Sequence, residues 1–135
     1  MAAPLVLRVL TPQRELCDEP VEQLTAEGTP GQFGVLPDHT VFLTSLEPGA
    51  LSFRPADGGQ RTLAVKGGYA EVRDNVVTVL ADDALPVESI DPSQARADLE
   101  RASAALDAAP FGDREHERAR RELRWAEVRL ALAGG

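Results

Sequence analysis

The stretch "TLAVKGGYAEVRDNVVTVL" (residues 62–80) decides the fold of the first part of the chain. Within it, short runs of β-branched and other apolar residues alternate with pairs of turn-forming residues. The runs are "TLAV" (62–65), "YAEV" (69–72) and "VVTVL" (76–80), and the pairs are Gly67-Gly68 and Asp74-Asn75. Short runs of this kind, bounded by turn signals, are typical of neighbouring antiparallel strands.

The same pattern extends back towards the N-terminus. Further apolar runs, separated by turns that contain Gly or Pro, are "LVLRVL" (5–10), "VEQLTAE" (21–27) and "ALSF" (50–53). No helical periodicity occurs before residue 90. Many short strands at this spacing predict an antiparallel β-sandwich or barrel.

The pattern changes near residue 90. Asp91 precedes Pro92, which is typical of a helix N-cap followed by proline at the first helical position, and Gln94 is placed to complete a capping box. Apolar residues then recur at alternating intervals of 4 and 3 in two runs that "PFGD" (110–113) separates. The runs are Ala95, Leu99, Ala102, Leu106, Ala109 and Ala119, Leu123, Ala126, Leu130, Ala133. They predict an antiparallel α-helical hairpin.

The sequence therefore predicts an α+β chain of two domains, a β domain over residues 1–88 and a helical hairpin over residues 89–135. The hairpin is expected to be weakly held, because alanines make up much of its seam and only the leucines add larger side chains. A second apolar stripe, Trp125, Val128 and Leu132, lies almost opposite the seam on the last helix. Two interpretations stay open for this stripe: packing on the β domain, or docking on another subunit.

Composition excludes several functional classes. The chain has 135 residues, with 22 Asp and Glu against 14 Lys and Arg, and its net charge of −8 argues against binding to nucleic acid or to an anionic membrane. Cys17 is its single cysteine, so no internal disulfide is expected and a reducing compartment is favoured. No signal-peptide pattern occurs, and no apolar run approaches the roughly 18 residues of a membrane span. We therefore expect a soluble protein that reaches a membrane only through a partner.

The stretch "GQFGVLPDHT" (31–40) is a glycine- and proline-rich loop that carries a histidine, and it is the natural place to look for chemistry. No catalytic motif surrounds Ser45 or Cys17, the nucleophiles that could act with His39. The two histidines, His39 and His116, fall in different domains and give no metal-ligand spacing. The glycines lack the Lys-Ser/Thr pair of a phosphate loop. Neither an enzyme nor a metal site is expected, and docking is the interpretation that remains.

Longer motifs point to a family. "GTPGQFGVLPDHTVFLTSLEPGAL" (28–51) resembles the G-x-x-G-x-x-G-[IV]-L-P-x-H stretch of the epsilon subunit of F-type ATP synthases, and "VKGGYAEVRDNVVTVLADDA" (65–84) resembles its G-G-[FY]-x-E-V stretch. The opening "LRVLTPQRELCDEPVEQLTAEGTPGQFG" (7–34) is similar to the first strands of that family. The resemblance runs from about residue 5 to the C-terminus, and the helical part is matched by pattern more than by motif.

The resemblance implies a fold and a role. It implies a flattened β-sandwich followed by a helical hairpin. It also implies a non-catalytic rotor subunit of the central stalk, beside the gamma subunit and on the c-ring, at the cytoplasmic face of the bacterial plasma membrane. Such a subunit couples ring rotation to the alpha/beta catalytic head. Its helices can extend along gamma and inhibit ATP hydrolysis.

The resemblance also implies which residues meet the partners. The interface with gamma and the c-ring is expected at Gly31, Gln32, Phe33, Gly34, Pro37 and His39. Two positions depart from the family pattern: Gln32 stands where Glu is frequent, and Val41 stands where Pro is usual. Regulatory contacts of the last helix are expected at Arg114, Arg118, Arg121, Arg124 and Trp125.

Some members of the family bind ATP in the folded hairpin through an Ile/Leu-Asp-x-x-Arg-Ala motif and arginines of the last helix. Ile90, Asp91, Ala95 and Arg129 match those positions, whereas Gln94 replaces the motif arginine and Trp125 another basic residue. Losing two cations weakens a phosphate site, so we expect no cofactor and ATP only as a weak regulatory ligand. The alternatives are a nucleotide-sensing hairpin protein and an unrelated assembly scaffold.

Overall fold

A computed structural model describes residues 4–134 of the chain. The chain divides into two compact units, one ending at Leu85 and the other beginning at Pro86. We refer to them as the β unit and the helical unit, and we describe each by itself. No helix in the described residues is long and apolar enough to cross a membrane.

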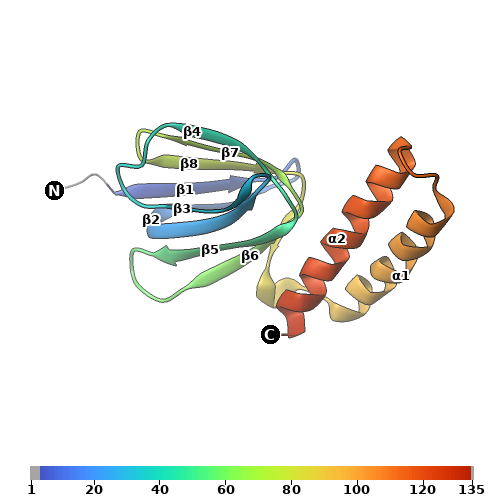
Figure 1. Cartoon of the computed structure of the whole chain (residues 1–135). Coiled ribbons are helices and arrows are strands. Elements are labelled where there is room, and N and C mark those ends of the chain that lie inside the picture. Colours follow the sequence, from blue (N-terminus) through green and yellow to red (C-terminus); the bar gives the residue numbers. More distant parts are fainter. Residues whose placement is uncertain (1–3, 135) are drawn as a thin grey trace. The chain divides into compact units, whose positions relative to one another are not determined.

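The β unit is built from short strands that share one continuous sheet (Figure 1). The strands are β1 (Leu5–Leu10), β2 (Glu15–Gly28), β3 (Gly31–Val35), β4 (Phe42–Leu46), β5 (Gly49–Pro55), β6 (Arg61–Val65), β7 (Gly68–Arg73), β8 (Val76–Ala81) and β9 (Ala84–Pro86). Their order is β1-β8-β7-β4-β2-β5-β6-β9, with β3 added beside β2 and a further pairing of β1 with β2. Because β1 pairs with both β8 and β2, the sheet folds back on itself into the predicted sandwich.

One pairing differs from the antiparallel prediction. Strands β1 and β8 run parallel, with Val6 opposite Val76 and Leu10 opposite Leu80. A parallel pair cannot be joined by a tight turn and needs a long crossover. Strands β2 to β7 supply that crossover, so the first strand can insert beside the eighth.

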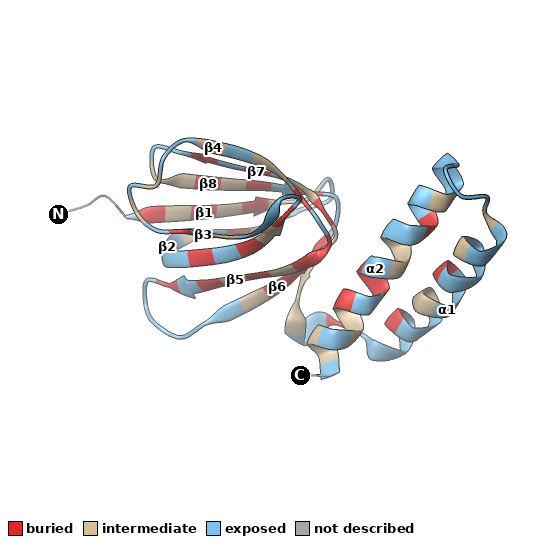
Figure 2. Cartoon of the chain, in the orientation of Figure 1, coloured by how far each residue is buried: buried red, intermediate tan, exposed pale blue. Residues whose placement is uncertain are grey.

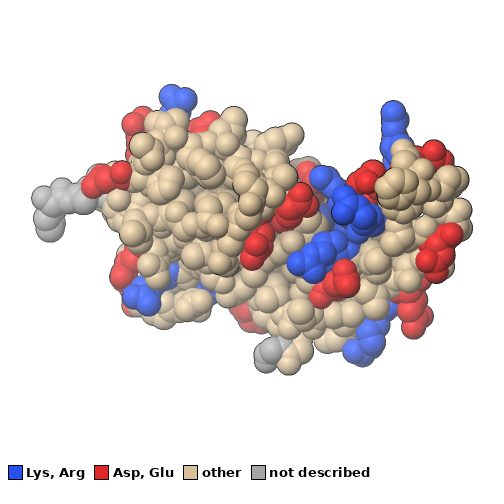
Figure 3. Space-filling view, in the orientation of Figure 1, with Lys and Arg blue, Asp and Glu red and all other residues tan. Residues whose placement is uncertain are grey.

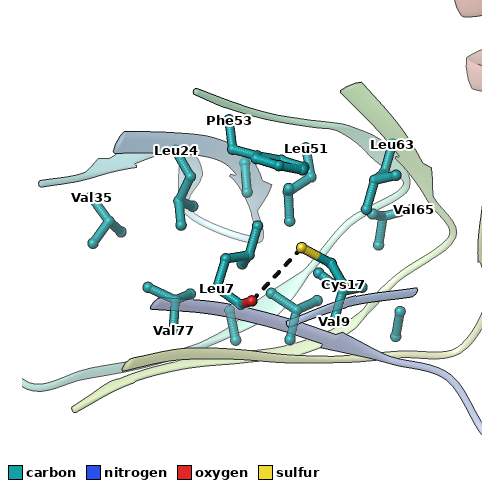
Figure 4. Packing of buried hydrophobic residues seen from close by; sticks show 14 of the residues in the cluster. Leu7, Val9, Cys17, Leu24, Val35, Leu51, Phe53, Leu63, Val65 and Val77 are labelled. Atoms are coloured by element: carbon teal, nitrogen blue, oxygen red, sulfur yellow. Dashed lines mark hydrogen bonds between the residues drawn. The ribbon is translucent and has the colours of Figure 1, made fainter. Parts of the chain in front are cut away.

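Large aliphatic side chains fill the space between the two layers (Figure 4). Leu5, Leu7, Val77 and Val79 are fully enclosed, and Phe53 is the largest side chain buried in this core. Cys17 is also buried, and its thiol donates to the Leu7 carbonyl oxygen at 3.7 Å. This burial raises the pKa of the Cys17 thiol to about 12, with a smaller contribution from the nearby Glu19 carboxylate.

The turn before β7 requires glycine. Gly68 has a φ of 127°, a region that side chains other than glycine rarely adopt. A Cβ at this position would also collide with the carbonyl oxygen of Leu80 on β8. The Gly67-Gly68 pair therefore allows β7 to approach β8 closely at the start of their ladder.

The helical unit holds the 3₁₀ turn η1 (Val87–Ser89) and the helices α1 (Pro92–Ala108) and α2 (Arg114–Gly134), which form the predicted hairpin. Asp91 is the N-cap of α1, since its Oδ1 accepts from the backbone N–H groups of Ser93 (3.0 Å) and Gln94 (3.4 Å). The capping box that the sequence predicts is absent. The Gln94 amide instead donates to Asp98 Oδ1 at 3.0 Å, because this ionised acceptor lies one turn ahead on α1.

The seam between the two helices is made of alanine more than of leucine. Its buried members are Ala95, Ala102, Ala119 and Ala126, whereas Leu99, Leu106, Leu123 and Leu130 are half-buried. Figure 2 shows the same contrast, with buried residues along the strands and only a narrow buried stripe on the helices. Small side chains let the two helices approach closely but remove little apolar surface from water.

Candidate functional site

The loop that carries His39 is shorter than the sequence predicts. Gly31–Val35 form β3 and pair with β2, with Gln32 opposite Glu27 and Phe33 opposite Ala26. The loop proper covers residues 36–41, in which Pro37 is half-buried. The glycines of "GQFG" therefore belong to a strand of the β2–β3 hairpin and not to a loop.

Aromatic contacts hold the loop against the sheet. The rings of Phe33 and Phe42 lie 5.3 Å apart, and the His39 ring meets the edge of Phe42 at 5.9 Å. His39 Nδ1 lies 2.8 Å from the Thr40 carbonyl oxygen. A carbonyl oxygen only accepts, so Nδ1 carries a proton and His39 is held as a donor within its own loop.

A pair of reciprocal hydrogen bonds ties the loop to the β7–β8 turn. The Asp38 backbone N–H donates to Asn75 Oδ1 at 2.6 Å, and Asn75 Nδ2 donates to Asp38 Oδ1 at 3.1 Å. Asp38, Asp74 and Asn75 all have positive φ, of 66°, 51° and 63°. Asp and Asn tolerate this conformation better than most residues do. The loop conformation thus depends on a turn 37 positions away.

An exposed apolar patch lies on the outer face of the sheet. Leu43 (β4), Tyr69 (β7) and Leu80 (β8) are 69%, 60% and 56% exposed. Tyr69 pairs with Leu80, and its other partner, Ser45, lies two residues from Leu43, so all three side chains share one face. This patch was not predicted from the sequence. The sequence of β8 does contain a sign of it. Val77 and Val79 face the core, so strand alternation places the apolar Leu80 on the outer face.

The last helix carries exposed arginines. Arg114, Arg118, Arg121 and Arg124 are all exposed and lie on one side of α2. Arg114, Arg118 and Arg124 make no ion pair with another described residue, whereas Arg120 pairs with Glu117 at 3.1 Å. Figure 3 shows arginines interspersed with acidic residues over the helical unit.

Trp125 and Arg129 occupy the less exposed side of the same helix. Trp125 is buried, and the Arg129 guanidinium lies 5.1 Å from the centre of its ring. Arg129 Nε also donates to the Trp125 carbonyl oxygen at 3.4 Å. Across the hairpin, Arg129 Nη1 forms an ion pair with Asp98 Oδ2 at 3.0 Å.

Both parts of the chain match family models. Residues 4–87 match the beta-sandwich domain of the ATP synthase Delta/Epsilon chain. Residues 88–134 match the long alpha-helix domain of the same chain. The chain belongs to the ATP synthase delta/epsilon chain family. The resemblance to epsilon subunits and the predicted order, sandwich then hairpin, are confirmed.

Relatives of this family member match over nearly their whole length. It is 41% identical over 135 residues to the ATP synthase epsilon chain of Geobacter metallireducens, covering 99% of this chain and 96% of the relative. The ATP synthase epsilon chain of Prochloron didemni is 39% identical over 133 residues, covering 97% of each.

Solved structures share the fold. A chain in the cryo-EM structure of the Euglena gracilis mitochondrial ATP synthase, OSCP/F1/c-ring in rotational state 1, superposes with a TM-score of 0.81 at 26% identity, over 97% of this chain and 82% of that chain. A chain of the Tetrahymena thermophila mitochondrial ATP synthase central stalk/c-ring has a TM-score of 0.68 at 16% identity, over 98% of both, which shows the fold alone.

The residues that the family resemblance assigns to ATP are already engaged within the protein. Ile90 and Ala95 are buried, Asp91 caps α1, and Arg129 is paired with Asp98. An anionic ligand would need free cations and backbone donors. In this chain the backbone N–H groups of Ser93 and Gln94 already donate to the Asp91 carboxylate. The Arg129 guanidinium already pairs with the Asp98 carboxylate. A triphosphate would have to displace these contacts in order to bind here.

Proposed function

We propose that this chain is the epsilon subunit of an F-type ATP synthase and works as a non-catalytic part of the rotor. In this role it lies in the central stalk, contacts the gamma subunit and the c-ring, and couples rotation to the alpha/beta catalytic head. The near full-length match to ATP synthase epsilon chains carries the proposal. The likeness to a chain of an F1/c-ring assembly supports it.

The β unit offers the docking surfaces that such a role needs. The patch of Leu43, Tyr69 and Leu80 gathers large exposed apolar side chains on the outer face of the sheet, which is typical of a protein interface. We assign this patch to gamma. We assign the β2–β3 hairpin end and the loop 36–41, stiffened by its aromatic contacts, to the c-ring side.

Reconstitution tests this assignment. A complex of the same source, freed of this subunit, is mixed with the full chain and passed over a sizing column, and co-elution with gamma is measured. Leu43→Ser and Tyr69→Ser should weaken binding by about tenfold or more, because both remove large side chains from the centre of the patch. Phe111→Ser is the matched control, since Phe111 is 92% exposed in the helical unit. Failure of the wild-type chain to co-elute would refute the function itself.

The exposed arginines of α2 support a second role, inhibition of ATP hydrolysis. Arg114, Arg118 and Arg124 have no partner among the described residues, so their charges are available to acidic segments of the catalytic head. Hydrolysis by a head depleted of this subunit is titrated with the full chain and with a chain ending at Glu88. Inhibition by the full chain alone places the activity in the helices.

Charge variants sharpen that test. The triple variant Arg114→Gln, Arg118→Gln and Arg124→Gln should lose most of the inhibition, whereas Arg120→Gln should keep it because Arg120 is paired with Glu117. Equal inhibition by all three proteins would reject a role for these charges. We further propose that the chain sits at the cytoplasmic face of the bacterial plasma membrane through its complex. Release from membranes together with the catalytic head would support this location.

A further inference from the structure

The most heavily engaged polar group of the helical unit is the Asp98 carboxylate. It accepts from Gln94 Nε2 at 3.0 Å and from Arg101 Nη1 at 2.9 Å, both on its own helix. It also pairs with Arg129 Nη1 at 3.0 Å, and this contact alone crosses to α2. The side chains of Asp98 and Arg129 are only 24% and 11% exposed, so the cross-helix pair is partly shielded from water.

Arg129 is held by three contacts inside the hairpin. One edge of its guanidinium faces Asp98, its Nε faces the Trp125 carbonyl oxygen, and its plane lies over the Trp125 ring. The family resemblance places this arginine among the residues that hold ATP. In this chain the anion that Arg129 meets is a carboxylate of the chain itself.

We propose that Asp98 decides what closes this hairpin: its carboxylate takes the position of a ligand phosphate at Arg129, so the hairpin closes on an internal ion pair and needs no nucleotide. Asp98 is thus a specificity-determining residue of the regulatory unit. This inference concerns the isolated chain. Only its consequence for ATP hydrolysis rests on the proposed function.

The position of the Asp98–Arg129 pair along the two helices bears on how it holds the hairpin closed. Asp98 lies in the first half of α1 and Arg129 in the second half of α2, so the ion pair joins the helices in the part of the hairpin away from the turn over residues 109–113. The ends of helices fray first. The seam alanines at this end, Ala95 and Ala126, add little apolar surface, although Trp125 and Val128 of α2 are buried as well. The ion pair adds a charged contact between the two helices at this point, which apolar packing does not supply.

The electrostatics favour the internal anion over an external one. Partial burial alone would raise the pKa of the Asp98 carboxyl, but the hydrogen bonds from Gln94 and Arg129, with the nearby arginine charges, hold it below its usual value. Asp98 is ionised at neutral pH and would repel a triphosphate. Gln94, which stands where the motif has an arginine, donates to Asp98 as well.

Hydrogen exchange on the full chain tests the closure. Asp98→Asn keeps the size and the oxygen acceptor but removes the charge. It should speed exchange of the backbone amides in the last turns of α2 about tenfold at neutral pH, because the free energy of opening this part of the helix falls. Asp107→Asn is the matched control, since Asp107 is an exposed residue of α1 with no described partner. Equal exchange in wild type and Asp98→Asn would overturn the proposal.

A double-variant cycle separates the ion pair from local packing. If the pair acts as a unit, Arg129→Gln, Asp98→Asn and the double variant should all show similar exchange. If the effects of the single variants add, the two residues act independently and the internal pair does not close the hairpin.

Calorimetry with Mg-ATP as the probe tests the replacement of a ligand. The wild-type chain should show no saturable binding up to about 1 mM, whereas Asp98→Asn should bind at least about tenfold more tightly, because Arg101 and Arg129 are freed and the repelling charge is gone. Micromolar binding by wild type, unchanged in Asp98→Asn, would overturn the proposal.

The consequence in the complex is measured separately. With the depleted catalytic head, Asp98→Asn should inhibit ATP hydrolysis at lower concentration than wild type, and Asp107→Asn should match wild type. If the wild-type chain does not bind the complex at all, the proposed function fails while the exchange and binding results still decide the role of Asp98.

Discussion

The two units of this chain differ in the size of the side chains that they bury. The β unit encloses Leu5, Leu51, Leu63 and Phe53 almost completely between its layers. The helical unit buries alanines along its seam, with Trp125 and Val128 as larger buried side chains of α2, and its seam leucines are only half-buried. Full burial of a leucine contributes about 1.5–3 kcal/mol, against about 0.8 kcal/mol for a single methyl-sized group.

The contrast indicates which unit is held more weakly. A sandwich held by enclosed aliphatic side chains is stiff, since interiors of that density do not deform gradually. A hairpin held by alanines depends on a few further contacts, of which the Asp98–Arg129 ion pair is the most shielded among the described residues. Stiffness suits a coupling surface in a rotor, and the proposed regulation would act through the more weakly held hairpin.

The largest expected effect comes from deleting matched leucines in the two units. Leu51→Ala should lower the free energy of unfolding of the β unit by about 2–5 kcal/mol, because it leaves a cavity in an enclosed core. Leu106→Ala should cost the helical unit only about 1 kcal/mol, since Leu106 is half-buried. Urea titrations followed by strand and helix signals measure both. Equal losses would mean that the seam packs as tightly as the sandwich.

How far the sequence predicts these units depends on how local each signal is. The runs at 62–65, 69–72 and 76–80 are each bounded by turn residues and appear as β6, β7 and β8. Strand β4 escapes prediction because Leu43 faces water beside the inward Phe42, which hides the alternation. Strand β3 escapes it because its glycines resemble a turn.

The site is less predictable than the fold, for the same reason. Asn75 reaches Asp38 across 37 positions, and Arg129 reaches Asp98 across the hairpin. Neither pair leaves a local spacing pattern, since the partners meet only after the strands or helices have packed. The motif resemblance located the loop and the helix, and only the structure shows which side chains hold them.

The next effect distinguishes the units by pH. Burial holds the pKa of Cys17 at about 12, above its ordinary value of 9.0, so the folded β unit keeps the proton that the unfolded chain releases. Its contribution to stability is intact below pH 9 and is lost as pH rises towards 12, at up to about 1.4 kcal/mol per pH unit. Cys17→Ala should flatten this alkaline decline in urea titrations. An identical slope in both proteins would show that the thiol is exposed to water in the folded state.

The helical unit should respond on the acid side instead. The pKa of Asp98 is lowered in the folded state, so its contribution is intact above its ordinary value of 3.8 and is lost as pH falls below it through the lower folded value. The helix signal of wild type should therefore weaken in acid more steeply than that of Asp98→Asn. Parallel acid curves for the two proteins would place the carboxylate outside any stabilising contact.

The smallest expected effect concerns the bonds between the loop and the β7–β8 turn. Asn75→Gly keeps the positive φ that the turn requires but removes both side-chain bonds to Asp38, and Asp74→Gly changes the neighbouring turn residue without touching either bond. Stability should change by less than about 1 kcal/mol in both, because these groups are exposed and water replaces the lost bonds. The Asp38 amide should exchange about fivefold faster in Asn75→Gly only, since a bond of about 1 kcal/mol corresponds to that factor. If binding to the gamma–ring complex weakens in parallel with this exchange, the turn over Asp74 and Asn75 orders the docking loop; if exchange rises while binding stays constant, the loop conformation is not what the partner recognises.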